Sequence, residues 1–90
     1  MRLTAVPANM TVPAGWTTEV VGDQHILVRS PGGYMATIDL ERRWFCSWMT
    51  TNGRPASIGK FAGRGWRSLL TQAAVDYLMP IETSRRKARP

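Results

Sequence analysis

The side chains that most often carry out catalysis are sparse in this sequence. The 90 residues include one histidine (His25), one cysteine (Cys46) and six acidic residues, with no recognised spacing among them. A cysteine nucleophile needs a histidine within hydrogen-bond reach, but the alternation of residues predicts His25 and Cys46 on different strands and on opposite faces of a sheet. A metal site needs three or four converging ligands. The sequence therefore predicts a protein that is not an enzyme and that holds no metal or cofactor.

Basic residues are concentrated in one stretch of the chain. Residues 42–75 carry a charge of +6 and contain no Asp or Glu, whereas residues 1–41 carry −2 and residues 76–90 carry +2. Three of the four tryptophans lie in the same stretch. A positive field beside large aromatic side chains is typical of surfaces that bind nucleic acid or another negative partner. The candidate binding residues are Arg42, Arg43, Arg54, Lys60, Arg64 and Arg67, with a second basic group in the tail at Arg85, Arg86, Lys87 and Arg89.

Two other interpretations of these charges remain open. The six cations of the acid-free stretch could solvate separate surfaces instead of forming one, and the tail could serve solubility alone. Gly63-Arg64-Gly65 stands before a predicted helix, whose free N–H groups would favour an anion. The tripeptide lacks the Lys-Ser/Thr ending of a P-loop, so the sequence favours a flexible helix entry over an anion site.

Alternating apolar and polar residues between short turn sequences predict strands in the first half of the chain. A loop is expected over residues 51–63, and a helix from about residue 64. Pro80 is expected to end this helix, because its ring disfavours helical geometry at the preceding residue. The predicted strands cover residues 16–21, 24–30, 34–40 and 44–50, and the apolar stripe of the helix is Trp66, Leu69, Leu70, Ala73 and Tyr77.

These elements predict an α+β fold, a four-stranded antiparallel meander with one C-terminal helix packed on one face (ββββα). Residues 1–15 are expected to form an extended N-terminal lead-in, residues 16–80 a single domain, and residues 81–90 a basic flexible tail. No run approaches the roughly 18 apolar residues of a membrane span, so the sequence predicts a cytoplasmic protein that does not contact a membrane.

One face of the predicted sheet is left without the helix. The helix stripe is expected to cover one face of the sheet, and one side of the fourth strand is also assigned to a core. The first face carries Ile26, Val28, Ala36, Ile38 and Leu40, and the side of the fourth strand carries Trp44, Cys46 and Trp48. The opposite face could stay exposed, could be partly covered by residues 1–15, or could form a homodimer. Its candidate partner contacts are Met35, Phe45 and Met49.

The segment GKFAGRGWR at residues 59–67, followed by Leu69-Leu70, Ala73-Ala74 and Leu78, resembles small uncharacterised proteins of phages and prophages in GC-rich bacteria. The resemblance implies an accessory protein of a mobile element, working in the host cytoplasm, that binds and blocks rather than catalyses. Two hypotheses follow. The protein binds DNA or RNA through its basic residues, or it is an anti-CRISPR-like inhibitor that blocks a host nucleic-acid-binding protein complex.

Overall fold

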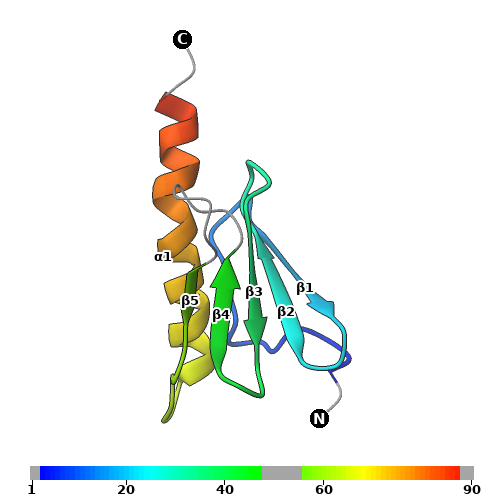
Figure 1. Cartoon of the computed structure of the whole chain (residues 1–90). Coiled ribbons are helices and arrows are strands. Elements are labelled where there is room, and N and C mark those ends of the chain that lie inside the picture. The colour runs from blue at the N-terminus through cyan, green and yellow to red at the C-terminus, as the bar shows by residue number, and fades with distance from the viewer. Residues whose placement is uncertain (1–2, 48–55, 88–90) are drawn as a thin grey trace.

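Short turns connect strands that are neighbours in the sequence and in the sheet. The computed structural model describes residues 3–47 and 56–87, and within these ranges the chain forms one sheet with the strand order β1-β2-β3-β4-β5, every neighbouring pair being antiparallel (Figure 1). A single C-terminal helix follows the strands. The elements are β1 (Thr17–Val21), β2 (His25–Arg29), β3 (Met35–Asp39), β4 (Trp44–Ser47), β5 (Ala56–Ile58) and α1 (Trp66–Lys87).

The predicted α+β fold, with a four-stranded antiparallel meander and one C-terminal helix on one face, is confirmed. The predicted loop over residues 51–63 contains a further short strand, β5, which pairs with β4 so that Phe45 lies opposite Ile58. Three residues are too few to show a period in the sequence. Of the predicted fourth strand, residues 48–50 lie outside the described ranges.

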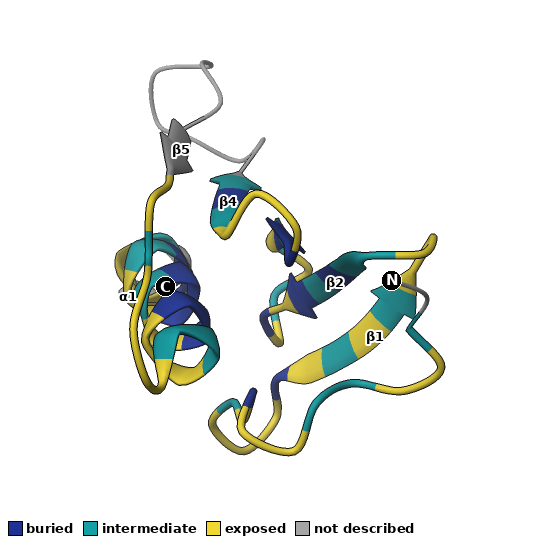
Figure 2. Ribbon diagram, turned by 90° about the horizontal axis from the view of Figure 1, so that it is seen from below, coloured by how far each residue is buried: buried dark blue, intermediate teal, exposed yellow. Residues whose placement is uncertain are grey.

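The core lies between the helix and one face of the sheet. Figure 2 shows α1 on one side of the curved sheet, with the buried parts of the helix turned toward the strands. The sheet side of this core follows the predicted alternation on β2 and β3. The buried sheet residues are Ile26, Val28, Ala36, Ile38 and Phe45, and those of the helix are Leu70, Ala74, Val75 and Leu78.

The N-terminal segment completes the core on the same side as the helix. Met10 is 3% exposed and belongs to the core cluster together with Trp16. The Leu3 N–H donates a hydrogen bond to the Asp23 carbonyl at 2.9 Å, which attaches this segment to the turn between β1 and β2. The segment therefore packs on the helix side, and the alternative in which it covers the opposite face is wrong.

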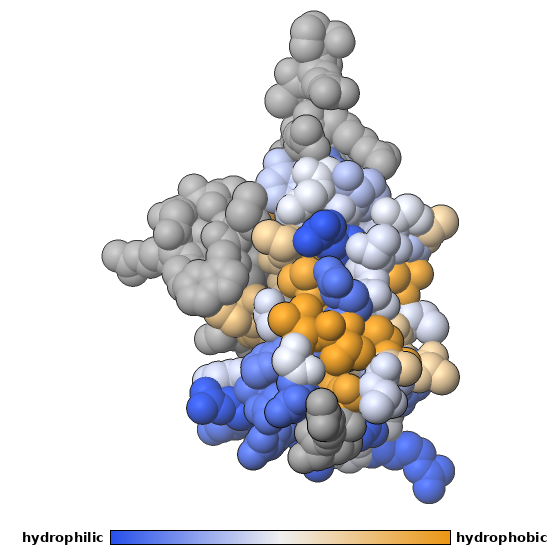
Figure 3. Space-filling view, turned by 90° about the vertical axis from the view of Figure 1, so that its right-hand side faces the viewer, coloured by the Kyte–Doolittle hydropathy of each residue, from blue (hydrophilic) through white to orange (hydrophobic). Residues whose placement is uncertain are grey.

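Apolar surface gathers on the side of the molecule that carries β1, the edge strand farthest from β5 in the sheet order (Figure 3). Val21 on this strand is 44% exposed. The neighbouring Val20 is partly buried against the core. This apolar edge is separated from β4 and β5 by β2 and β3.

The two faces of β4 are the reverse of those predicted. Phe45 lies opposite Ile38 on β3, is fully buried, and has its ring centroid 5.9 Å from that of Tyr77 on the helix. Trp44 and Cys46 consequently point to the helix-free face, where they are partly exposed. A single-residue change in register moves every side chain of a strand to the other face. The turn before β4 sets this register, and its last residue, Arg43, has a left-handed φ of 60°.

The helix is longer than predicted. It continues through Pro80 to Lys87, so residues 81–87 are helical and not a flexible tail. Pro80 cannot donate a hydrogen bond to the carbonyl four residues earlier, but tertiary contacts on its C-terminal side compensate. Ile81 packs against the core, and the buried Glu82 carboxylate accepts a hydrogen bond from the Gly32 N–H in the turn between β2 and β3.

The buried face of α1 is also rotated relative to the predicted stripe. Leu69, assigned to the stripe, is 56% exposed, whereas Thr71 is 1% exposed. The Thr71 hydroxyl is satisfied within the helix, because it donates a hydrogen bond to the Arg67 carbonyl at 2.8 Å. A buried hydroxyl with a local acceptor can occupy a core position, which the apolar pattern alone does not reveal.

Candidate functional site

Two arginines from distant parts of the chain converge on one tryptophan at the start of the helix. The Cζ atom of Arg43, in the turn between β3 and β4, lies 4.8 Å from the centroid of the Trp66 ring. The Cζ atom of Arg67 lies 4.6 Å from the same centroid. A guanidinium at this distance from an indole gains about 0.5–1 kcal/mol at an exposed site. Trp66 therefore joins the β3–β4 turn to the first turn of α1 and holds two cations against one ring.

A second arginine–tryptophan pair joins the same turn to the start of β4, on the helix-free face of the sheet. The Cζ atom of Arg42 is 5.2 Å from the centroid of the Trp44 ring. The segment after β5 passes close to the same ring, since a Cβ atom added at Gly59 would lie 3.1 Å from the Trp44 Cβ and 3.3 Å from its Cε3. Contacts tighter than about 3.4 Å are rare for real side chains, so glycine is the residue that allows this approach.

The segment after β5 also brings Lys60 to the β3–β4 turn. The Phe61 N–H donates a hydrogen bond to the Arg43 carbonyl at 3.4 Å. Within the described ranges, the two non-glycine residues with positive φ are Arg43, at 60°, and Lys60, at 67°. Left-handed backbone is unfavourable for residues with a Cβ atom, and such strain is often found at functional sites. Both strained residues are cations of the candidate site.

These contacts define a basic surface at the junction of the β3–β4 turn, the segment after β5 and the start of α1. Arg43 and Arg67 contact Trp66, and Arg42 contacts Trp44. Lys60 belongs to the segment after β5, next to Phe61, and Arg64 belongs to the turn that begins the helix. The basic surface is the set Arg42, Arg43, Lys60, Arg64 and Arg67. Five of the six cations predicted from the acid-free stretch thus belong to one region, and Arg54 lies outside the described residues.

Most cations of the basic surface have no acidic side chain near enough to form an ion pair in the described part of the chain. Among the residues that the structure describes, Arg42 has a carboxylate within 4.0 Å, at 3.9 Å between its Nε and Asp39 Oδ2, whereas Arg43, Lys60, Arg64 and Arg67 form no ion pair. The first turn of α1 contains no acid, and a helix N-terminus adds a positive partial charge. Among the described residues, none accepts a hydrogen bond from the buried Arg67 Nε. The surface therefore presents a positive field to solvent.

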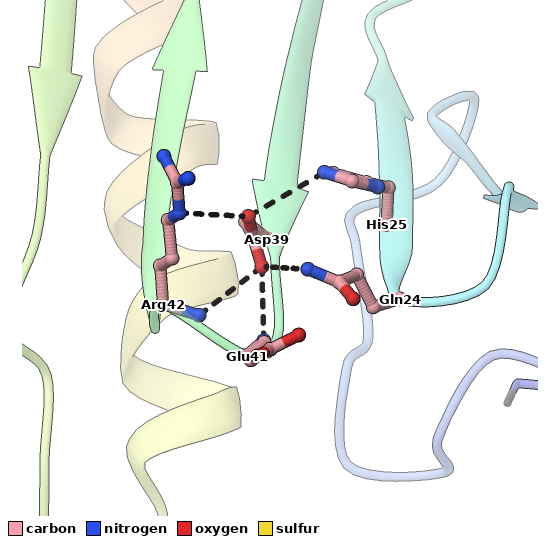
Figure 4. A network of polar contacts seen from close by, with 5 residues as sticks. All are labelled: Gln24, His25, Asp39, Glu41 and Arg42. Carbon is pink, nitrogen blue, oxygen red and sulfur yellow. Dashed lines mark hydrogen bonds and ion pairs between the residues drawn. The ribbon is translucent and has the colours of Figure 1, made fainter. Parts of the chain in front are cut away.

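Asp39 organises the turn from which Arg42 and Arg43 project. Its Oδ1 accepts hydrogen bonds from the Glu41 N–H at 2.9 Å, the Arg42 N–H at 3.1 Å and the Gln24 side-chain amide at 3.1 Å (Figure 4). Its Oδ2 lies 3.5 Å from the His25 Nε2. A carboxylate that accepts several backbone N–H bonds fixes the conformation of a turn.

Asp39 stays ionised despite being only 7% exposed. Burial by itself would raise the pKa of this carboxyl group, but the hydrogen bonds from Arg42, Gln24 and Glu41, together with the charge of His25, lower the pKa below its ordinary value. The turn is therefore held by a negative group on the strand side, while its arginines face outward with Trp44 and Trp66.

The predicted contacts on the helix-free face are only partly available. Phe45 is buried in the core and cannot contact a partner, which corrects the prediction. Met35 does lie on this face and is 36% exposed, with its Sδ accepting a hydrogen bond from the Arg29 guanidinium at 3.7 Å. Met49 lies outside the described residues. Of the tail cations, Arg85, Arg86 and Lys87 are in the helix, and Arg89 lies outside the described ranges.

His25 and Cys46 lie on the same face of the sheet, and their predicted placement on opposite faces is wrong. His25 is on β2 and pairs with Asp39, while Cys46 is on β4 and pairs with Thr37, so β3 separates them. Two strands with a third between them are roughly 10 Å apart, which is beyond hydrogen-bond reach. Among the described residues, no group of three or more His, Cys, Asp or Glu side chains converges on one point.

The sequence did not reveal that the tryptophans of the site support arginine side chains. Trp66 was expected to be a core residue, yet it is partly exposed and supports two guanidinium groups. The adjacent pairs Arg43-Trp44 and Trp66-Arg67 are the signal in the sequence. Only the fold shows that Arg43 contacts Trp66 and not its neighbour, because that contact depends on the register of β4.

Comparison with known proteins leaves the site to be interpreted from its own geometry. In the parts of the chain that the structure describes, no helix has both the length and the apolar character needed to cross a membrane. The chain matches no protein-family model, no curated protein and no solved structure.

Proposed function

We propose that this protein is a non-catalytic nucleic-acid-binding protein that contacts phosphate groups through its basic surface. The observation that supports this most is the placement of Arg43 and Arg67 on one tryptophan, at 4.8 Å and 4.6 Å from the ring centroid. Neither arginine forms an ion pair with an acid in the described part of the chain. A stacked guanidinium can donate from its edge to a phosphate in two parallel hydrogen bonds. In Arg67 the buried Nε is not one of these donors.

The arrangement also reduces the side-chain conformational entropy that the protein would lose on binding. An arginine that is free to rotate loses roughly 0.5–1.5 kcal/mol when an interface immobilises it. Contact with Trp66 restricts Arg43 and Arg67 before a ligand arrives. Preorganised cations beside a helix N-terminus are suited to a ligand with regularly spaced negative charges.

The direct test is duplex binding by variants that remove one charge at a time. Replacing Arg43 or Arg64 by glutamine is expected to weaken binding of a nonspecific DNA duplex by about five- to tenfold each, because each variant loses a charge-assisted contact. Arg29→Gln is the matched control, since Arg29 is exposed on β2 at the end away from the β3–β4 turn and pairs with Glu19 at 4.0 Å. Equal loss in all three variants would contradict the assignment of the site.

A truncation separates the basic surface from the C-terminal cations. A chain that ends after Thr83 keeps the contact between Glu82 and Gly32 and removes Arg85, Arg86, Lys87 and Arg89. It should retain most of the duplex affinity, and complete loss would assign binding to the tail. If neither form binds DNA or RNA, the remaining candidate is an inhibitor that binds a protein complex.

A further inference from the structure

We infer that the basic surface recognises the sugar–phosphate backbone without base stacking, so that its ligand is a duplex; this inference rests on the function proposed above. Proteins that bind single strands through their bases present aromatic rings on which the bases stack. The basic surface contains two tryptophans, so stacking is the obvious expectation. The contacts of these rings argue against it.

The ring of Trp66 is already occupied. The guanidinium groups of Arg43 and Arg67 both lie within 5 Å of its centroid, and the remainder of the side chain packs against the core. A base could stack on this ring only by displacing one guanidinium, which would remove the cation that attracts the phosphate. Trp66 thus positions the arginines and does not itself serve as a stacking platform.

The ring of Trp44 is occupied in a similar way. Arg42 lies 5.2 Å from its centroid, and the backbone of Gly59 approaches both its Cβ and its ring atom Cε3. Arg42 is in turn held near Asp39, at 3.9 Å between its Nε and Oδ2. Displacing this guanidinium would break a cation–π contact and an ion pair at once, so Trp44 is also a support for an arginine.

The other aromatic residues in the described ranges are part of the core or pack against it. Phe45 is fully buried and Trp16 is 9% exposed, while the remaining ones are partly buried against the same cluster. They are Tyr34, Phe61 and Tyr77. The described surface therefore offers positive charge to a ligand but little free aromatic area, which fits phosphates and not bases.

The ligand with the most phosphates per unit length is a double helix. Duplex DNA carries one negative charge per roughly 1.7 Å of its axis, about twice the linear density of one of its strands. A surface that reads phosphates alone should therefore bind a duplex more tightly than a single strand of the same length, and should be indifferent to the bases.

The test compares three oligonucleotides of equal length, about 16 nucleotides, with the full chain: a duplex, a mixed-sequence single strand, and a single strand with abasic sites at every position that retains its phosphates. We expect the duplex to bind most tightly and the two single strands to agree within about twofold. Stacking would instead make the abasic strand weaker by roughly 5–150-fold per stacked base, and that result would overturn the inference while leaving the proposed function intact. If none of the three binds, both the function and the inference fail.

Two variants extend the comparison to single residues. Trp66→Leu should weaken binding of the abasic and base-bearing strands by the same factor, because it releases Arg43 and Arg67. A loss confined to the base-bearing strand would show stacking on Trp66 and overturn the inference. Should Trp66→Leu fail to fold, Arg43→Gln in the exposed turn is measured in the same way, and it must also affect both strands equally.

Discussion

Two cations of the basic surface occupy backbone conformations that glycine would adopt more easily. Arg43 and Lys60 have φ values of 60° and 67°, and both lie where the β3–β4 turn meets the segment after β5. A residue with a Cβ atom in this region loses on the order of 1 kcal/mol relative to glycine. Strained backbone of this kind is often found at functional sites.

Lys60→Gly should therefore make the protein more stable and weaken its binding to a nucleic-acid duplex. The expected gain is up to about 1 kcal/mol in the free energy of unfolding, because glycine tolerates the left-handed conformation. Duplex affinity should fall, with a salt dependence less steep by about one unit because one phosphate contact is lost. Urea unfolding and binding titrations measure the two quantities. A variant that loses stability, or keeps full affinity, would show that the lysine has another role.

Asp39 should make the stability of the protein depend on acid pH. Its pKa is lowered in the folded state, so its stabilising contribution is complete above the unfolded pKa, near 4, and is lost as the pH falls through the folded value. The stability difference between the wild type and Asp39→Asn should therefore be largest near neutral pH and should shrink toward pH 2. Asp23→Asn, in the exposed β1–β2 turn, is the control. A difference that stays constant across this range would contradict the account.

At the scale of the elements, the strands were easier to predict than the helix. Alternation identified the four long strands and the buried faces of β2 and β3, because one side of each packs on the helix. The orientation of β4 could not be predicted, since it depends on the left-handed conformation of Arg43 in the preceding turn. The basic surface was predicted as a set of residues, but its connection across the fold depends on the contact of Arg43 with Trp66, which lies far away in the sequence.

The helix continues through Pro80 because the contacts beyond it outweigh the missing hydrogen bond. Pro80 is exposed, while Ile81 packs against the core and Glu82 is bound by the Gly32 N–H. Pro80→Ala should therefore raise the free energy of unfolding by about 1–3 kcal/mol, because alanine restores the donor and relieves the clash. Guanidinium unfolding followed by circular dichroism measures this change. Unchanged or lower stability would show that the geometry imposed by Pro80 is needed to place Glu82.

At the scale of the whole molecule, the cations of the acid-free stretch are gathered where three segments meet. These are the β3–β4 turn, the segment after β5 and the start of α1. Cations gathered in this way give a positive field with one direction, which steers a polyanion toward one side of the protein. The attraction of a polyanion therefore depends on where the cations lie as well as on the net charge of +6.

The central claim, that the basic surface binds the phosphates of a nucleic acid, is tested most directly by the salt dependence of duplex binding. With about five phosphate contacts, the logarithm of the association constant should fall against the logarithm of salt concentration with a slope of about −4 to −5 between 50 and 200 mM salt. The double variant Arg43→Gln, Arg64→Gln should reduce the steepness by about two units, and Arg29→Gln should not change it. Undetectable binding, or a slope near zero in the wild type, would contradict the claim.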